Sequence, residues 1–343
     1  MSTIRDVAKS AGISVAAASA VLNGNGSGRI RVSPATRQRI YEAAEALSYR
    51  PNHLARGLAT GRKGIVGLVF PYPGGFFGQD PFCSLVMTGV FEEVAREKHN
   101  IMLHTATGDG WNTAEPDDLI DSRIDGLLLV LPMPESPVIA ACRRLDFPYV
   151  ALAYNPTDPE VLAVNADEFR GGSLATEHLI ALGHRRIAHL SWPEYIATSH
   201  GRRAGYEWAL REAGLPSMVV PTEVDREGGY RAMSELLDGP ADRHPTAVFA
   251  ASDLCAEGAI RAIRHQGRRV PDDIAVVGYD DTWFAGLAQP KLTSVRMPIA
   301  EMGRTAAEML IALIEGRPVV ERQPILPVSL TVRDSCGATA APA

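Results

Sequence analysis

Residues 3–22 read TIRDVAKSAGISVAAASAVL and predict two short helices separated by a tight turn. Thr3 and Asp6 have the spacing of a capping box, which marks the start of the first helix. Gly12 suits the left-handed residue that ends a helix, and Ser14 is a typical N-cap for the second helix. Two helices joined in this way form a helix-turn-helix, whose second helix can enter the major groove of DNA. Spacing alone is weak evidence, since many small helical domains show it.

A third helix is predicted to begin at Ser33-Pro34, because serine is a common N-cap and proline suits the first helical turn. Its apolar residues recur at helical spacing and are interpreted as core: Ile40, Ala43, Ala44 and Leu47. Between the second and third helices, residues 23–28 read NGNGSG. A phosphate-binding glycine loop follows a strand, whereas this one follows a helix, so we interpret it as a connector.

Charge is distributed unevenly along the chain. Residues 1–63 contain ten Lys and Arg but only three Asp and Glu, a balance of +7, whereas the whole chain carries −6. The remainder therefore carries −13. A basic head on an acidic body predicts that only the head contacts a polyanion such as DNA, although a solvated basic face without a partner has the same composition.

Bulk features exclude several classes of protein. A chain of 343 residues is too long for one ordinary core and predicts two or three compact units. No apolar run reaches the roughly 18 residues that span a bilayer, and the first residues lack the layout of a secretory signal. The cysteines form no CxxC pair, which is typical of free thiols in a reducing cytosol: Cys83, Cys142, Cys255 and Cys336. We therefore expect a cytoplasmic protein with no membrane contact.

Metal, cofactor and catalytic sites are not expected. His178, His184 and His189 straddle a predicted helix, its end and a strand, so their side chains should not converge on one ion. Asp280 and Asp281 could suggest acid–base chemistry, but adjacent side chains point apart and no nucleophile–base pair accompanies them. The pattern favours a binding protein over an enzyme.

A longer ordered match carries more information than any of these features. It comprises residues 4–14 (IRDVAKSAGIS), Ser19, residues 21–23 (VLN), residues 32–37 (VSPATR) and residues 49–58 (YRPNHLARGL). In these stretches, and through most of the remaining sequence, the chain resembles the lactose-repressor/galactose-repressor (LacI-type) family of bacterial transcription regulators. The resemblance implies three parts: a helix-turn-helix DNA-binding domain at 1–50, a hinge helix and linker at 51–63, and an effector-binding and dimerisation domain at 64–343.

The resemblance also implies which residues contact DNA. They are Thr3, Arg5, Val15, Ala16, Ala17, Ser19, Asn23, Tyr49, Asn52, His53, Arg56 and Leu58. Leu58 matches the leucine that the family inserts between base pairs in the minor groove. Such an apolar wedge unstacks a base step in exchange for a kinked duplex that fits the protein better.

The chain departs from the family pattern on the second helix. Ala17, Ala18 and Ala20 stand where the family usually has a threonine, a valine and a basic or polar residue. Few hydrogen-bond donors remain on this helix, so we expect base recognition to use thymine methyl groups, Ser19 and neighbouring side chains such as Arg5. The departure leaves the operator sequence open.

From Ile65 onward, short apolar runs alternate with helical patterns, which predicts an α/β fold. Runs such as residues 65–70 (IVGLVF) and 126–131 (GLLLVL) are continuously apolar, as in parallel strands covered on both faces. The alternation is typical of doubly wound parallel sheets. The resemblance implies two such lobes in a periplasmic-binding-protein-like body, with lobe 1 at about 64–163 and 293–335 and lobe 2 at about 164–292.

Ligands of such sheets bind at the carboxyl ends of the strands, and several polar or aromatic residues follow predicted strands or match effector-contacting positions of the family. The predicted effector-binding set is Asp80, Phe82, Arg202, Tyr230, Ser252, Asp253, Asp280 and Trp283. Carboxylates, an arginine and aromatic faces suit a polar ring such as a sugar. Two assignments stay open: Asp253 as a helix cap instead, and Trp283 as a stacking wall or a lobe-packing residue. Ala153-Tyr154 stands where the family often has an acid, so the ligand is expected to differ from that of better-known relatives.

The sequence therefore predicts a DNA-binding regulator, most simply a repressor, controlled by a small molecule that is a sugar or sugar derivative. We expect a homodimer, with a tetramer as the other possibility, on a near-palindromic operator. An exported solute-binding protein would share the body but would need a signal peptide. A nucleotide-dependent enzyme would need a glycine loop after residues 65–70, where the chain reads PYPGGF.

Overall fold

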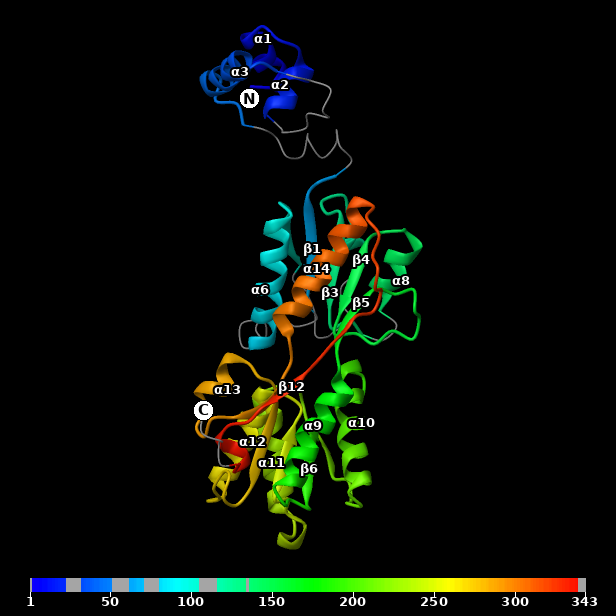
Figure 1. The fold of residues 1–343 in the computed structure, drawn as a ribbon, viewed down its shortest axis with the longest axis vertical. Helices are drawn as coiled ribbons and strands as arrows, with labels where there is room; N and C mark the ends of the chain where they lie inside the picture. The colour runs from blue at the N-terminus through cyan, green and yellow to red at the C-terminus, as the bar shows by residue number, and fades with distance from the viewer. Residues whose placement is uncertain are drawn as a thin grey trace. The chain divides into compact units, whose positions relative to one another are not determined.

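The computed structural model describes residues 2–22, 32–50, 62–70, 80–104, 116–133 and 136–338 (Figure 1). The chain divides into two compact units, Met1–Gly64 and Ile65–Ala343, which we call the head and the body. The predicted hinge at 51–63 falls almost entirely outside the described residues.

The head contains the three predicted helices, α1 (Ile4–Ala11), α2 (Val15–Leu22) and α3 (Pro34–Ala46). The capping box is present, because Thr3 N donates to Asp6 Oδ2 over 2.8 Å and Asp6 N donates to Thr3 Oγ1 over 3.4 Å. Gly12, at φ +64°, ends α1 in the left-handed conformation. The helices share one small core of buried residues: Val7, Ala11, Val21, Ile40, Ala43 and Ala44. The helix-turn-helix prediction is confirmed.

The first lobe of the body is built on a parallel sheet with the strand order β11-β5-β4-β3-β1-β2. Its strands are β1 (Ile65–Val69), β2 (Asn100–His104), β3 (Gly126–Val130), β4 (Tyr149–Leu152), β5 (Ala163–Ala166) and β11 (Ile325–Leu326). The helices of this lobe are α6 (Pro81–Arg96), α7 (Pro116–Leu119), α8 (Pro137–Arg144) and α14 (Ile299–Glu315). The expectation that continuous apolar runs form buried parallel strands is confirmed.

The second lobe repeats this architecture with the strand order β12-β10-β9-β8-β6-β7. Its strands are β6 (Ile187–Ser191), β7 (Val219–Pro221), β8 (Ala247–Ala250), β9 (Ala275–Asp280), β10 (Thr293–Arg296) and β12 (Ser329–Thr331), and only β12 is antiparallel to its neighbour. The accompanying helices are α9 (Glu168–Ala181), α10 (Ala197–Glu212), α11 (Arg226–Asp238), α12 (Asp253–His265) and α13 (Trp283–Leu287), with short 3₁₀ turns at Ala241–Arg243 and Asp334–Cys336.

The C-terminal part of the chain does not follow the predicted lobe boundaries. Residues 293–335 were assigned to lobe 1, but β10 and β12 pair within the second sheet, and only α14 and β11 belong to the first. β11 and β12 lie in different sheets although only two residues separate them, and one of the two is Pro327, which lacks the N–H that a ladder needs. The chain therefore passes between the lobes three times.

Glycines set the closest approach of α6 and α14, which lie side by side in the first lobe (Figure 1). A Cβ added at Gly89 would overlap the carbonyl oxygen of Ala300. We expect Gly89→Ala to lower the free energy of unfolding by about 1–3 kcal/mol, because two packed helices must separate. Gly286→Ala is the matched control, since a Cβ there meets nothing within 4 Å. Urea unfolding of both variants checks this, and equal stabilities would contradict the close packing.

A candidate ligand cleft and a candidate DNA-binding face

Residues from both lobes line one cavity in the body. The first lobe contributes Asp80, Phe82, Leu131 and Ala153, the second contributes Trp192, Thr198, Arg202, Val224, Ser252, Leu254 and Asp280, and Met297 comes from the connection between β10 and α14. Most of these residues follow the carboxyl ends of strands, where ligands of open α/β sheets bind. The cavity volume is about 10 Å³, room for about one water molecule. A sugar-sized ligand enters only if the two sets of residues move apart.

The backbone of the cleft is strained at three strand ends. Leu131 after β3, Ala153 after β4 and Asp280 at the end of β9 have φ values of 49°, 56° and 100°. Residues other than glycine seldom adopt positive φ, and such conformations gather at functional sites. This supports the cavity as a site that the fold holds in a particular shape.

Arg202 of α10 lies at the centre of the polar part of the cleft and is almost fully buried. Its Nε donates to Glu168 Oε2 over 2.7 Å, its Nη2 donates to Glu168 Oε1 over 3.3 Å, and its Nη1 donates to the Ala251 carbonyl. Its guanidinium carbon lies 3.8 Å from the Tyr279 ring centre. Arg202 is therefore held in place by a bidentate ion pair and an aromatic face before any ligand arrives.

Two carboxyl groups line this cleft from different lobes, those of Asp80 and Asp280. Burial raises the pKa of Asp80 from 3.8 to about 6, although the Phe82 N–H, 2.9 Å from Oδ1, and the Arg202 charge lower it. Burial also raises the pKa of Asp280 well above 3.8, opposed by Arg202 and reinforced by the neighbouring carboxylates. Perturbed carboxyl groups in a cleft are typical of functional sites.

These shifts predict how stability depends on pH. Burial likewise raises the pKa of Asp253 from 3.8 to about 7. Between the unfolded and folded pKa values these carboxyl groups bind more protons in the folded protein, so they make the free energy of unfolding fall as pH rises from about 4 to about 7. Burial lowers the pKa of His189 from 6.5 to about 4, which makes an opposite contribution in the same range. The scale is about 1.4 kcal/mol per unit of pKa shift. Urea unfolding across this range should give a less negative slope of the free energy of unfolding against pH for Asp80→Asn than for the wild type or for the exposed-site control Asp117→Asn. Equal slopes would contradict the burial of Asp80.

Three predicted effector residues lie outside the cavity lining. Asp253 accepts from Thr282 N over 2.8 Å, from Thr282 Oγ1 over 3.0 Å and from Ser294 Oγ over 2.6 Å, so it joins the loop after β9 to β10. It does not cap α12 either, because Ser252 Oγ accepts from Cys255 N. Asp253 is a buried structural carboxylate.

Tyr230 and Trp283 have other surroundings. Tyr230 lies between α11 and α12, where its hydroxyl is 3.0 Å from His265 Nδ1 and its ring centre is 4.3 Å from the Arg261 guanidinium. Trp283 is 62% exposed on α13 and contacts Phe284 at its edge, so among the described residues it neither walls the cavity nor packs one lobe on the other. Tyr230 does not line the cavity; in this part of the chain, the residue that does is Val224, just before α11.

Sequence reasoning missed several lining residues. Trp192 directly follows β6, so it could have been predicted from the tendency of ligands to bind at the carboxyl ends of strands. Thr198 lies in the first turn of α10 and has no such signal. Both side chains are buried, and among the described residues neither Trp192 Nε1 nor Thr198 Oγ1 has a hydrogen-bond partner. Glu168 was also missed, because nothing in a charged residue at the start of a helix reveals that it is buried against an arginine.

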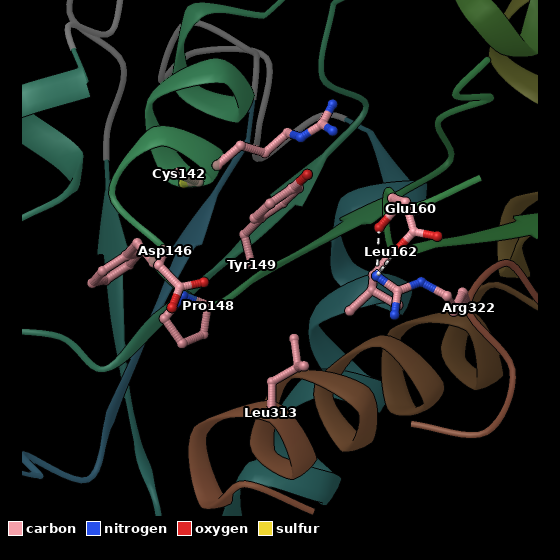
Figure 2. Close-up of a pocket in the computed structure, with 10 residues that line it drawn as sticks. Cys142, Asp146, Pro148, Tyr149, Glu160, Leu162, Leu313 and Arg322 are labelled. Atoms are coloured by element: carbon pink, nitrogen blue, oxygen red, sulfur yellow. Dashed lines mark hydrogen bonds and ion pairs between the residues drawn. The ribbon is translucent and has the colours of Figure 1, made fainter. Parts of the chain in front are cut away.

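A larger pocket of about 420 Å³ lies at the opposite, amino end of β4 (Figure 2). Both arginines of this pocket are already paired: Arg322 Nη2 lies 3.4 Å from Glu160 Oε2, and Arg143 Nη2 lies 2.7 Å from Asp158 Oδ2. Figure 2 shows Arg322 directed at Glu160, with Tyr149 and Leu313 along the floor. Paired charges leave little for a ligand, so the smaller cleft is the stronger candidate.

The candidate DNA-binding face is the exposed side of α2 with the start of α1. Val15 is 42% exposed, Ala16 is exposed, and Ala17 and Ser19 are half-buried. Thr3 and Arg5 are exposed at the start of α1, whereas Tyr49 packs partly buried against the head core. The remaining predicted contacts lie outside the described residues: Asn23, Asn52, His53, Arg56 and Leu58. Among the described residues, no helix is long and apolar enough to cross a membrane.

Comparisons with known proteins cover both units. Residues 3–52 match the family of bacterial regulatory proteins, lacI family, and residues 176–336 match a periplasmic binding protein-like domain. The chain is 35% identical to the HTH-type transcriptional regulator CelR of Thermobifida fusca, over 97% of this chain and 98% of CelR. It is 34% identical to the HTH-type transcriptional regulator GalR of Escherichia coli, over 98% of this chain and 96% of GalR.

Solved structures agree with these relatives. A CelR–cellobiose complex superposes with a TM-score of 0.72 at 32% identity, covering 98% of this chain and all of that one. The lac repressor dimer bound to operator and the anti-inducer ONPF superposes with a TM-score of 0.85 at 28% identity, covering 98% of this chain and 99% of that one. The similarity therefore extends through the head as well as the body.

Proposed function

This chain belongs to the LacI family of bacterial regulatory proteins, and from that premise we propose that its head binds a specific operator while a small molecule in the body's cleft sets the strength of that binding. The observation that carries the proposal is the cleft itself, where Asp80 and Phe82 of one lobe meet Arg202, Ser252 and Asp280 of the other. A ligand that contacts both lobes binds one lobe arrangement better than another and so shifts the population of states.

The proposed DNA contacts in the head are the exposed Thr3, Arg5, Val15 and Ala16 with the half-buried Ala17 and Ser19. The wedge role of Leu58, and the contacts of Asn23, Tyr49, Asn52, His53 and Arg56, remain proposals from the family resemblance. The charge balance of +7 on residues 1–63 supports this division, because phosphate contacts supply most of the affinity for DNA.

The proposed partners follow from the relatives. One lac repressor structure is a dimer on its operator, and the ligands in two related structures are cellobiose and ribose. We propose a homodimer on a near-palindromic operator, with a sugar or sugar derivative as effector, acting in the cytoplasm by binding alone and without catalysis.

Selection of binding sites from random duplexes by the full chain should enrich two half-sites related by a dyad. Failure to enrich any sequence would refute operator binding.

The uncharged surface of α2 predicts how bases are read. Methyl groups of Val15 and Ala16 suit contact with thymine methyls in the major groove. Replacing contacted thymines of the selected operator by deoxyuridine should weaken binding about fourfold per methyl, or about 0.8 kcal/mol. Val15→Ala should cause a smaller loss on the deoxyuridine duplex than on the thymine duplex, which a double-mutant cycle of dissociation constants measures. Deoxyuridine outside the half-sites is the control, and additive losses would contradict the contact.

A further inference from the structure

The charges that face the cleft do not balance. Among the described residues that line it, Arg202 is the sole cation, while Asp80 and Asp280 are both acidic. Arg202 is already neutralised by Glu168, to which it donates two hydrogen bonds. Asp280 Oδ1 lies 3.9 Å from Arg202 Nη2, within ion-pair distance but beyond hydrogen-bond distance. In the closed cleft one guanidinium is therefore shared among three acidic side chains, those of Glu168, Asp80 and Asp280.

The segments of the body outside the described residues cannot supply a further cation. Its segments at 71–79, 105–115, 134–135 and 339–343 contain no Lys, Arg or His. Two of them add acidic residues instead: Asp109, Glu115 and Glu135. These segments therefore add no cationic side chain to the one guanidinium of the cleft.

Two unpartnered groups point to a polar ligand at the same place. Trp192 is 9% exposed and Thr198 is 2% exposed, both line the cavity, and within the described part of the chain Trp192 Nε1 and Thr198 Oγ1 make no hydrogen bond. Buried polar groups are nearly always paired, so unpaired ones at a cavity indicate a partner that binds there. Trp192 offers a donor and Thr198 offers both a donor and an acceptor.

The remaining wall of the cavity makes an unbalanced charge costly. It consists of apolar side chains, mostly buried: Phe82, Leu131, Val224, Leu254 and Met297. A neutral ligand closed into this site would leave the acidic side chains either charged in an apolar setting with one shared cation or protonated at neutral pH, and both cost free energy. A ligand with its own positive charge would remove that cost and gain charge-assisted hydrogen bonds.

We propose that the ligand of this cleft carries a protonated amine next to hydroxyl groups, as an amino sugar does. Asp80 and Asp280 hold the ammonium from the two lobes, and Trp192 Nε1 and Thr198 Oγ1 bond the neighbouring oxygens. This inference rests on the proposed function for the use of the cleft as the effector site. It adds that the chemical class of the effector is a hydroxylated cation rather than a neutral sugar.

The test compares matched ligands on the full chain near neutral pH. Glucose, glucosamine and N-acetylglucosamine share one ring, and only glucosamine carries a positive charge; the galactose and mannose series extend the set. Calorimetric titration should show that at least one amine binds about tenfold more tightly than its neutral counterparts, or about 1.4 kcal/mol. Equal or tighter binding of the neutral members, or no binding by any amine, would overturn the proposal.

Substitutions test whether the preference for the amine over the neutral ligands depends on the two carboxyl groups. Asp80→Asn should reduce the preference for the amine about tenfold, whereas Asp117→Asn, an exposed site in the same lobe, should leave it unchanged. If Asp80→Asn does not fold, Asp280→Asn provides the same test in the second lobe. Its control is Asp242→Asn, at an exposed site. An unaltered preference in a folded variant would also overturn the proposal. Operator binding measured on the same preparations separates this outcome from a failure of the proposed function.

Discussion

Replacing Glu168 by glutamine is expected to lower the free energy of unfolding of the body by about 3–5 kcal/mol. The Glu168 side chain is 5% exposed and forms a bidentate pair with Arg202, which is 2% exposed. Glutamine keeps the shape of the side chain but removes the counter-ion that is hydrogen-bonded to the buried guanidinium, which leaves only Asp280 Oδ1 at 3.9 Å from Arg202 Nη2. Loss of one partner from a buried pair costs much more than loss of an exposed pair.

Urea unfolding of three variants separates this explanation from a general effect on α9. Glu177→Gln on the same helix removes an exposed pair with Arg170 and should cost less than about 1 kcal/mol. The double variant Glu168→Leu with Arg202→Met removes both members of this pair and should recover part of the loss, because neither is left buried without the other. A Glu168→Gln variant as stable as Glu177→Gln would show that the pair does not carry the stability assigned to it.

The second large effect is expected at Asp280. In Asp280→Asn, a bound effector should no longer alter the affinity for the operator, because the carboxylate at the end of β9 is the second lobe's acidic contact in the cleft. Truncating one partner of a buried charged contact typically costs 2–5 kcal/mol, or about 30-fold or more in effector affinity. Fluorescence anisotropy with labelled operator, at rising effector concentration, measures the response. Asp242→Asn should respond as the wild type does, and a full response in Asp280→Asn would remove Asp280 from the site.

Local features of the sequence were sufficient to predict the head. Thr3, Asp6, Gly12 and Ser33 act on their immediate neighbours, so the capping box, the left-handed turn and the start of α3 follow from spacing alone. The parallel strands of the body were also predictable, since strands such as Gly126–Val130 are buried on both faces and have no polar alternation.

The C-terminal pairing was not predictable in the same way. β10 joins the second sheet by pairing with β9, and β12 joins it by pairing with β10, from which it is distant in sequence. No local pattern encodes that choice. The assignment of residues 293–335 to lobe 1 was wrong for β10 and β12, because the chain passes from one lobe to the other between β11 and β12.

The cleft was predictable in part. Asp80, Ser252 and Asp280 were chosen because they follow strands or match the family, and the structure places them around one cavity. Asp253 has the same sequence context as Ser252, yet its side chain turns toward Ser294 and Thr282. Orientation at a strand end depends on tertiary packing, which spacing does not report. For the same reason the burial of Glu168 against Arg202 could not be read from the sequence.

The central claim is that occupancy of the cleft controls how tightly the head binds DNA. The most direct test is the dissociation constant of the full chain for its selected operator, measured against random competitor duplex at moderate salt, without and with saturating effector. We predict a clear preference for the operator and a change of about 5–150-fold on effector binding. Equal affinity for operator and random duplex, or an operator affinity that saturating effector leaves unchanged, would contradict the claim.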